Sequence, residues 1–307
     1  MTPADTGLDA VTGAFSYSGR AIAARLAQEG RRVRTLTGHP ERAPEGTDID
    51  VRPLDFDDPV GLADSLRGVT TLYNTYWVRF ARGRTDHDVA VANSRTLFAA
   101  ARRAGVRRIV HVSITNPSIE SPFPYFRGKA LVERALTETA ASFAAVRPAI
   151  LFGGDGVLLN NIAWLVRRFP VFPVGGDGGY RVRPIHVDDL AALCVRLGAE
   201  STDSVTDAVG PERPTFREMV EMIGDAVDHR PCIVDVPPVT VPVLASLVGR
   251  AVSDVLLTRD EYLALAAGLA DTDGAATGPT SLSEWLAAHG SELGNSYANE
   301  LVRHFAR

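Results

Sequence analysis

The chain has 307 residues and a formal net charge of −5, with 45% hydrophobic and 22% charged residues. This length can bury the core of one large domain or of two joined domains, and the scattering of arginines among acidic residues disfavours nucleic acid as a partner. No apolar stretch reaches the roughly 18 residues of a membrane span and no signal-peptide pattern occurs, so we expect a cytoplasmic protein without a membrane partner.

Up to about residue 200, short apolar runs alternate with amphipathic stretches. The predicted strands are residues 8–12, 33–37, 50–54, 71–75, 108–113, 143–147 and 181–187. The predicted helices between them include residues 19–28, 59–66, 88–104 and 129–139. Strand–helix alternation at this spacing predicts an α/β fold, in which a doubly wound parallel sheet is covered on both faces.

From about residue 202 the pattern changes to predicted helices with a crowd of prolines at 231, 237, 238 and 242. The predicted helices are residues 216–227, 241–252, 259–269 and 281–289. We therefore expect a sheet domain over residues 1–201 and a smaller, mostly helical lobe over residues 202–307, with residues 150–180 contributing partly to that lobe. Cys194 and Cys232 lack metal-ligand spacing, which predicts free, buried thiols and no metal site.

The first predicted strand runs into a glycine turn and then a helix. In such a turn, backbone N–H groups and the helix dipole can hold a pyrophosphate. Gly13 and Gly19 keep the spacing of the first and last glycines of this motif, while Ser16 stands in the place of the middle one. Serine is the smallest substitute, and its hydroxyl could bond a phosphate. The candidate cofactor contacts also include the neighbouring residues Phe15, Tyr17 and Ser18.

The end of the second strand usually selects between the two nicotinamide dinucleotides, because an acid there binds a ribose hydroxyl and a base accepts a 2′-phosphate. Here Gly38 is followed by His39 and Arg42, with no acid at the strand end itself. This favours NADP, with NAD possible, against the alternative that these are ordinary exposed loop residues.

Two further strand ends carry polar or aromatic residues. After the third strand, Asp55 and Phe56 stand where an adenine group could bind. The fourth strand ends in Asn74, Thr75, Tyr76 and Trp77. At the carboxyl edge of a parallel sheet such residues face the cofactor cleft, and we assign Asn74 and Thr75 to cofactor and the two rings to substrate. Packing of the rings in the core is the alternative.

Lys129 is the only lysine of the chain, so 31 of its 32 basic residues are arginine. Arginine is a planar fork that keeps its proton, whereas lysine is a compact cation, so one retained lysine indicates a role that arginine cannot fill. Tyr125 precedes it by four residues, which places both side chains on one helix face. The alternative is an exposed lysine paired with Glu133. The fifth strand delivers Ser113 and Thr115 to the same sheet edge.

The order of glycine turn, strand-end Ser/Thr and Tyr-x-x-x-Lys resembles the short-chain dehydrogenase/reductase superfamily. Residues 146–148, 151–153 and 185–189 are similar to segments of its extended and atypical branches, among them epimerases and dehydratases, nitrogen-metabolite-repressor-like (NmrA-like) proteins and a complex I accessory subunit. The short distance to Tyr125 and the absent middle glycine favour the atypical branch. The resemblance implies a Rossmann-type sheet with the helical lobe closing the cleft, and cofactor contacts at Pro148 and Phe152.

The resemblance also implies catalytic roles. Tyr125 would exchange a proton with a substrate hydroxyl or carbonyl, since a nearby ammonium pulls a phenol's pKa of about 10 toward neutrality. Lys129 would supply that ammonium and bond the nicotinamide ribose, and Ser113 or Thr115 would hold the substrate oxygen. Asn161 could touch substrate or cap a helix.

The implied function is an NAD(P)-dependent oxidoreductase, active as a monomer or homodimer on a small carbonyl or alcohol. A sugar nucleotide or a secondary-metabolite intermediate would be such a substrate, and epimerisation through a ketone is a variant. The alternative is a redox-silent dinucleotide sensor or scaffold.

Overall fold

The computed structural model describes residues 7–83, 85–139 and 141–305. The chain divides into two compact units. Unit 1 comprises the residues up to Pro148 together with Val187–Ala208, and unit 2 comprises Ala149–His186 and the residues from Val209 onward. The predicted boundary near residue 201 differs from this division, because the chain leaves unit 1 after Pro148 and returns to it for one helix and one strand.

Unit 1 is built on a seven-stranded sheet in which every pairing is parallel. Its strand order is β10-β6-β5-β4-β1-β2-β3. The strands are β1 (Leu8–Thr12), β2 (Arg32–Thr37), β3 (Asp50–Pro53), β4 (Val69–Asn74), β5 (Arg108–Val112), β6 (Ser142–Pro148) and β10 (Ser204–Ala208). The order reverses between β1 and β4, which makes the sheet doubly wound and confirms the predicted Rossmann-type fold.

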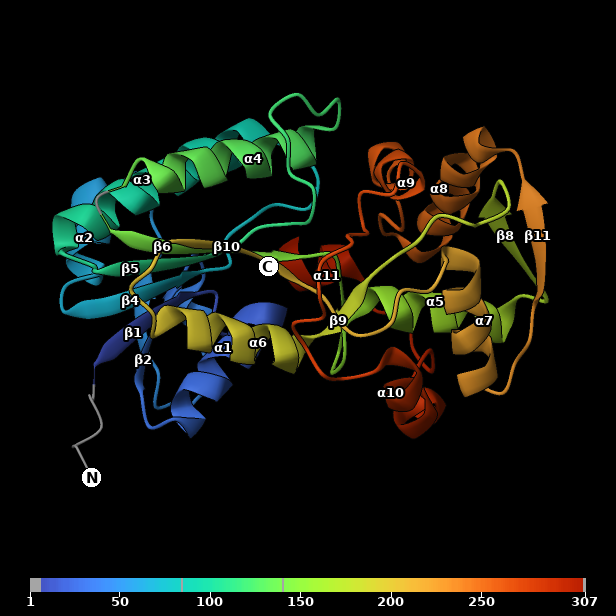
Figure 1. The fold of residues 1–307 in the computed structure, drawn as a ribbon, viewed down its shortest axis with the longest axis horizontal. Helices are drawn as coiled ribbons and strands as arrows, with labels where there is room; N and C mark the ends of the chain where they lie inside the picture. The colour runs from blue at the N-terminus through green and yellow to red at the C-terminus, as the bar shows by residue number, and fades with distance from the viewer. Residues whose placement is uncertain (1–6, 84, 140, 306–307) are drawn as a thin grey trace. The chain divides into compact units, whose positions relative to one another are not determined.

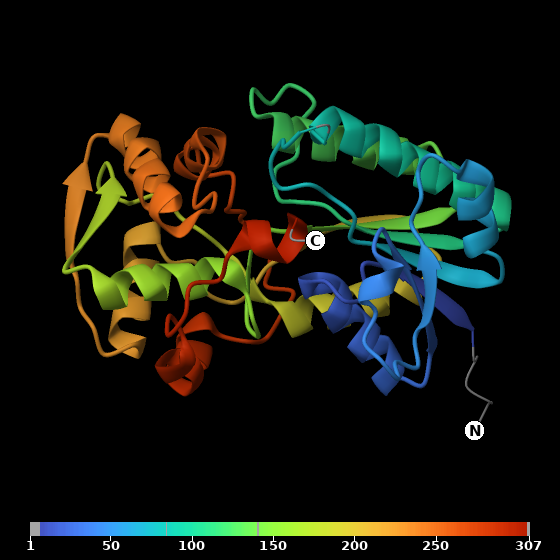
Figure 2. The same ribbon diagram turned by 180° about the vertical axis from the view of Figure 1, so that it is seen from behind.

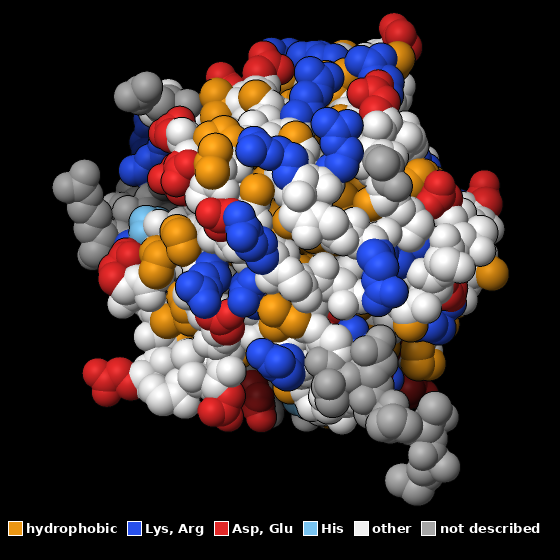
Figure 3. All heavy atoms as spheres, turned by 90° about the vertical axis from the view of Figure 1, so that its left-hand side faces the viewer, with side chains coloured by type: hydrophobic (Ala, Val, Ile, Leu, Met, Phe, Trp, Pro, Cys, Tyr) orange, Lys and Arg blue, Asp and Glu red, His pale blue; other side chains and the backbone are white. Residues whose placement is uncertain are grey.

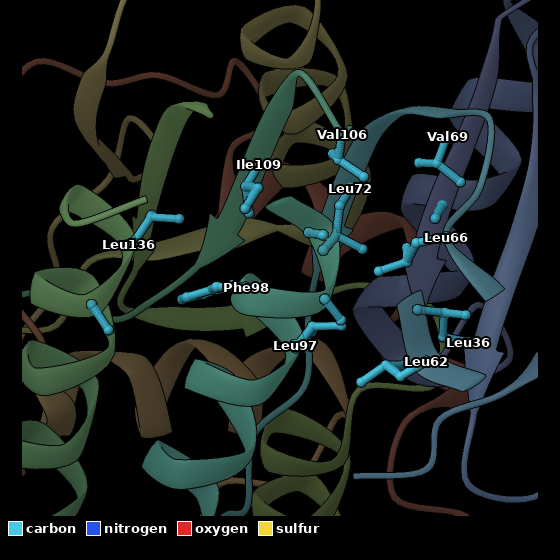
Figure 4. Close-up of a cluster of buried hydrophobic side chains, with 14 of the residues drawn as sticks. Leu36, Leu62, Leu66, Val69, Leu72, Leu97, Phe98, Val106, Ile109 and Leu136 are labelled. Atoms are coloured by element: carbon cyan, nitrogen blue, oxygen red, sulfur yellow. The ribbon is translucent and has the colours of Figure 1, made fainter. Parts of the chain in front are cut away.

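Helices cover both faces of this sheet (Figures 1 and 2). On one face lie α1 (Tyr17–Gln28) and α6 (Val187–Gly198), and on the other α2 (Pro59–Ser65), α3 (His87–Ala104) and α4 (Pro124–Thr137). Leucine, valine, phenylalanine and isoleucine side chains fill the space between the sheet and the second set of helices (Figure 4). Burial of this apolar area is the main force that holds the layers together.

Local signals explain where several helices of unit 1 begin and end. The side chain of Asp86 accepts the backbone N–H of Val89 and caps the first turn of α3. The same helix ends at Gly105, which has φ of 77° and adopts the left-handed conformation that glycine tolerates. Pro124 at the first position of α4 fits a helix start, because its missing N–H has no intrahelical partner there. The helix therefore begins five residues before the predicted stretch 129–139 and includes Tyr125, as the predicted Tyr125–Lys129 pair on one helix face requires.

The seventh strand of the sheet also differs from the prediction. Of residues 181–187, only Pro184–His186 form a strand, β9, which pairs with β7 (Ile150–Phe152) in unit 2. The large sheet is completed instead by β10, which pairs with β6. Strand β10 lies at the edge and only Ala208 is fully buried, so its sequence lacks the apolar run that marks a central strand.

Unit 2 has its own hydrophobic core, formed by residues of α5, α7 and α10 together with β7 and β8. Its helices are α5 (Val157–Arg168), α7 (Phe216–Ala226), α8 (Val241–Val252), α9 (Arg259–Ala266), α10 (Leu282–His289) and α11 (Glu300–Phe305). Its second strand pair joins β8 (Val171–Gly175) to β11 (Cys232–Val236). This unit is mostly helical, as predicted, but of the four short strands among its described residues, only β9 falls within a predicted strand, residues 181–187.

The surface carries charges of both signs, and one face shows arginines interleaved with acidic side chains (Figure 3). Among the described residues, no helix is long and apolar enough to cross a membrane. Cys194 is buried and free, whereas Cys232 is free but exposed, so the prediction of two buried thiols holds for the first only. The reason is that Cys232 begins a strand at the surface of unit 2.

Candidate functional site

The strand order reverses between β1 and β4, and ligands of such sheets bind beyond the carboxyl ends of the strands at this point. Backbone and side chain tie the two strand ends together here. The Thr75 N–H donates to Thr12 Oγ1 over 2.7 Å, and Thr75 Oγ1 donates to the Thr12 carbonyl over 2.6 Å. The predicted cofactor residue Thr75 therefore lies at the switch point and holds the glycine turn beside it.

The glycine turn has the close packing that its two glycines require. Gly13 has φ of 66°, and its N–H donates to the Leu36 carbonyl. A Cβ atom on Gly19 would lie 2.1 Å from the Gly13 carbonyl oxygen. Only glycine at residue 19 lets the first turn of α1 approach the strand end this closely. The residues present therefore fit a pyrophosphate cradle at the amino terminus of α1.

Ser16, in the place of the middle glycine, directly precedes α1, and its side chain makes no capping hydrogen bond to that helix. Its Oγ donates to the Gly13 carbonyl over 2.6 Å, and its side chain is exposed. A hydroxyl has one hydrogen, so in this arrangement it cannot also donate to a phosphate. The serine hydroxyl thus stabilises the turn, and its predicted phosphate bond stays a prediction. The other predicted contacts of the turn are half-buried, namely Phe15, Tyr17 and Ser18.

The residues after β2 form an exposed turn that contains His39 and Arg42, the two predicted contacts of a 2′-phosphate. Gly38 is open on all sides, and the short helix Pro40–Arg42 follows. Glu41 Oε1 lies 3.1 Å from His39 Nδ1 and 3.9 Å from Arg42 Nε. The two predicted phosphate contacts thus share a carboxylate, which a 2′-phosphate would have to replace as their partner.

Phe56, which follows β3, and Tyr76, which follows β4, are predicted site residues that pack on each other. The rings of Phe56 and Tyr76 lie 4.8 Å apart between centroids, and the Tyr76 hydroxyl accepts a hydrogen bond from Asn93. Burial raises the pKa of Tyr76, so this phenol stays protonated at neutral pH. Asp55 is exposed and accepts the N–H of Asp57 in a local turn. Its predicted contact with adenine stays a prediction.

Asn74 has a different environment from the predicted cofactor contact. Its side chain is fully buried, and its Oδ1 accepts hydrogen bonds from Thr12 Oγ1 and the Tyr76 N–H. Its Nδ2 lies 3.1 Å from His111 Nδ1. Thr12, Asn74 and His111 thus form a hydrogen-bonded row across β1, β4 and β5, which we call the polar row. The carboxyl-edge rule located Asn74 correctly but could not show that its side chain points into the protein.

Lys129 is buried on α4, with only 3% of its surface exposed. Its Nζ donates to the Val112 carbonyl at the end of β5 over 2.8 Å. Burial lowers the pKa of Lys129 to about 7, and the Glu133 carboxylate opposes this change. Glu133 itself forms a two-bond pair with Arg147, with N–O distances of 2.9 and 2.5 Å. The alternative of an exposed Lys129–Glu133 pair is therefore wrong.

Trp77 covers this ammonium. The Lys129 Nζ lies 4.6 Å from the centre of the indole ring, a cation–π contact. The indole also packs against Gly128, where a Cβ atom would meet it at 2.8 Å. Tyr125 contacts the same indole edge-on, with ring centroids 5.7 Å apart, and is half-buried. Trp77 is thus the common neighbour of Tyr125 and Lys129. Its ring packs on α4, which agrees with the alternative that this ring belongs to the core.

The two candidate hydroxyls at the end of β5 are both buried. The N–H groups of Ser113 and Thr115 donate to the carbonyls of Val146 and Pro148 on β6. In the described part of the chain, Ser113 Oγ is a buried polar atom without a hydrogen-bond partner. Buried polar groups in proteins are nearly always paired, so this hydroxyl is the better placed of the two to receive a ligand oxygen. Pro148, a predicted cofactor contact, is buried and lends its carbonyl to the sheet.

Two predicted site residues belong to the core of unit 2. Phe152 is 1% exposed and packs against His186 and Trp285, instead of presenting its ring to a ligand. Asn161 lies within α5, where both ends of its amide bond the Ala298 backbone over 2.9 Å. It neither caps the helix nor has a free polar atom for substrate. Neither environment could be predicted from the sequence, because the partners, Trp285 for Phe152 and Ala298 for Asn161, lie more than a hundred residues along the chain.

His111 is the residue that the sequence analysis missed. It is fully buried beneath α3, and in the described part of the chain its Nε2 lacks a hydrogen-bond partner. Burial holds the pKa of His111 well below its usual value, and the nearby Lys129 acts in the same direction. A histidine between two valines of a central strand was the available signal, because histidine is uncommon in such positions.

A family model described as NAD(P)H-binding matches residues 13–163, which include the glycine turn, Asn74 and His111 of the polar row, and Lys129. This part of the chain is an NAD(P)H-binding domain. The match confirms the predicted nicotinamide dinucleotide cofactor and the resemblance to the extended short-chain dehydrogenase/reductase group.

Known proteins similar to the NAD(P)H-binding domain and beyond it differ in activity. The chain is 26% identical over 244 residues to a mitochondrial NADH dehydrogenase alpha subcomplex subunit 9 of Arabidopsis thaliana, covering 74% of this chain and 60% of the relative. It is 31% identical over 198 residues to a ceramide reductase of Caulobacter vibrioides, covering 62% of this chain and 60% of the relative. The chain therefore spans about 60% of the length of each.

Among solved structures, the NADPH-dependent quinone oxidoreductase QOR2 of Escherichia coli, in complex with NADPH, has a similar fold. Its TM-score is 0.73 at 19% identity, with 93% of this chain and 99% of that chain covered. At this identity the similarity establishes the fold alone.

Proposed function

We propose that this chain is an NAD(P)-dependent oxidoreductase that reduces a small carbonyl compound or oxidises the corresponding alcohol, with epimerisation through a ketone as a variant. The observation that carries the proposal is the position of Lys129. The single lysine of the chain is buried at the carboxyl end of β5, next to the switch point of a dinucleotide-binding sheet. A lysine that served only as a surface charge would remain in solvent, because burying an ammonium costs free energy.

The chemistry follows from the residues around Lys129. When bound, the nicotinamide supplies or accepts the hydride. Tyr125 exchanges the proton of the substrate oxygen, and Lys129 lowers the pKa of its phenol and bonds the ribose. Ser113 offers the hydroxyl that holds the substrate oxygen, while Thr115 is the second candidate. The relative from Caulobacter vibrioides, a ceramide reductase, supports this class of reaction.

Turnover tests this proposal directly. We expect the protein to oxidise NADPH in the presence of a carbonyl or quinone acceptor. The loss of nicotinamide absorbance measures the rate, and identification of the reduced product establishes the reaction. The acceptors to be tested are simple ketones, aldehydes, quinones and sugar nucleotides. Saturable NADPH binding without turnover of any acceptor would favour the second candidate function.

That second candidate is a redox-silent dinucleotide sensor or scaffold. The observation that favours it is Trp77, whose ring covers the Lys129 ammonium, so that the cation is already paired with an indole and a backbone carbonyl. The match to a subunit of a respiratory complex is consistent with such a role. A sensor would bind NADPH and change its shape or its partner without oxidising the nicotinamide.

For the cofactor, we expect NADPH to bind more tightly than NADH, because His39 and Arg42 flank the place of the 2′-phosphate. Titration of each dinucleotide, followed by energy transfer from protein to nicotinamide, measures both affinities. Glu41→Gln should increase the preference for NADPH, since it removes the carboxylate that His39 and Arg42 share. Tenfold tighter binding of NADH, a difference of about 1.4 kcal/mol, would contradict the expectation.

A further inference from the structure

The polar row lies on the face of the sheet that α3 and α4 cover. Two residues earlier on the same strands, Ala10, Leu72 and Ile109 belong to the core beneath these helices. Side chains two apart on a strand share a face, so Thr12, Asn74 and His111 point to the same side. The strand register pairs Asn74 directly with His111.

The hydrogen bonds of the row determine the orientation of the Asn74 amide. A backbone N–H can only donate, so the atom of Asn74 that receives the Tyr76 N–H must be its oxygen. The NH2 group therefore faces His111 Nδ1, at 3.1 Å. An amide NH2 group can only donate, so Nδ1 must accept and carries no hydrogen. His111 is consequently neutral, with its hydrogen on Nε2.

The Lys129 Nζ donates to the carbonyl of Val112, the residue that follows His111, and the side chains of Lys129 and His111 are both buried. Two like charges in one poorly solvated place repel strongly, so such a pair holds a single charge at neutral pH. Burial already lowers the pKa of His111, whereas the backbone of Asn74 opposes this change. The side-chain amide of Asn74 acts with burial, because its NH2 group faces Nδ1 and disfavours a hydrogen there.

We propose that Asn74 is a positioning residue that assigns the single positive charge of this buried pair to Lys129, by keeping His111 in its neutral Nε2–H form. The catalytic consequence rests on the proposed function, in which the Lys129 ammonium is required. The charge assignment itself is a property of the protein without substrate. It explains why a polar row occupies three central strands where apolar residues would pack more simply.

Other titratable groups around Lys129 do not replace this control. Glu133 on the same helix favours the ammonium but is paired with Arg147 of β6. His87 on α3 stacks on the Trp77 indole, and Tyr125 contacts both of these rings edge-on. Each of them is left in place by a substitution at Asn74.

The single lysine makes the charge directly measurable, because a protein labelled with 13C-lysine gives one assignable side-chain signal. In Asn74→Asp, the carboxylate accepts a hydrogen bond from Nδ1 and, as a nearby opposite charge, raises the pKa of His111. We therefore expect His111 to take up a second proton and become an imidazolium. Residue 74 contacts His111, and His111 precedes Val112, whose carbonyl binds Lys129. We expect the apparent pKa of Lys129 to fall by about 1, a tenfold weaker proton affinity, as this signal is followed with pH.

The sign of this change separates the proposal from simple electrostatics. An added carboxylate that acts only through space would raise the pKa of Lys129, and a Lys129 pKa that rises or stays unchanged in Asn74→Asp overturns the proposal. Asn93→Asp is the matched control. It adds the same charge on α3, where Asn93 bonds Tyr76 and not His111, and it should not lower the pKa of Lys129.

A measurement on the unaltered protein needs no variant to fold. With 15N-histidine labelling, His111 should show an unprotonated Nδ1 and a protonated Nε2, and no titration between about pH 5 and 8. A His111 signal that titrates in this range, or that carries its hydrogen on Nδ1, overturns the proposal. Neither labelling experiment depends on turnover, so a protein without oxidoreductase activity would still decide the charge assignment.

Discussion

Lys129→Arg is expected to lower turnover by roughly 10²-fold or more, because it removes a positioned proton-transfer system. The Lys129 ammonium fits between the Val112 carbonyl and the Trp77 indole, with almost no exposed surface. A guanidinium is longer and planar, and it cannot place one compact charge in this space. Turnover with the best acceptor, measured together with NADPH affinity, checks the expectation.

Three further variants give this result its meaning. Tyr125→Phe should lose at least as much turnover as Lys129→Arg, and the double variant should be little worse than either, since the pair acts as a unit. Arg134→Lys, the same exchange reversed at an exposed position of α4, should leave turnover unchanged. Turnover near that of the unaltered protein in Lys129→Arg would reduce the single lysine to coincidence, and the sensor function would then lead.

Gly19→Ala is expected to weaken NADPH binding at least about tenfold, or about 1.4 kcal/mol, and to lower stability by roughly 1–3 kcal/mol. The new Cβ atom would lie 2.1 Å from the Gly13 carbonyl oxygen and 2.8 Å from its carbon, so the backbone of the glycine turn must shift. That shift would move the N–H groups that we expect to hold the pyrophosphate. Dinucleotide titration and chemical unfolding measure the two effects.

The matched control is Gly38→Ala, because an added Cβ there has no atom within 4 Å. We expect its stability to change little, while Gly19→Ala unfolds at lower denaturant concentration. Equal stability of the two variants would mean that the turn tolerates the methyl group. The close approach of α1 to β1 would then not depend on a glycine at residue 19.

The sequence by itself determined the order of the first six strands, the helices between them and the position of the glycine turn. These features follow from local patterns, since apolar periodicity, helix caps and turn residues act over a few neighbours. It also singled out Lys129, because an almost complete absence of lysine is visible without coordinates. The nicotinamide cofactor was also predictable from the sequence, because the glycine turn, the strand-end hydroxyls and the Tyr-x-x-x-Lys pair occur in a recognisable order.

Only the tertiary structure decided which side chains meet. The amide of Asn74 bonds His111 instead of facing the cofactor, Glu133 pairs with Arg147 instead of Lys129, and Asn161 holds the backbone of Ala298. Strand β10 likewise joined the sheet through pairing with β6, some sixty residues earlier. A residue's own sequence neighbourhood shows its chemistry but not its partner. Partners are selected by packing and by the need to satisfy each buried polar group, and both depend on segments that meet only when the chain folds.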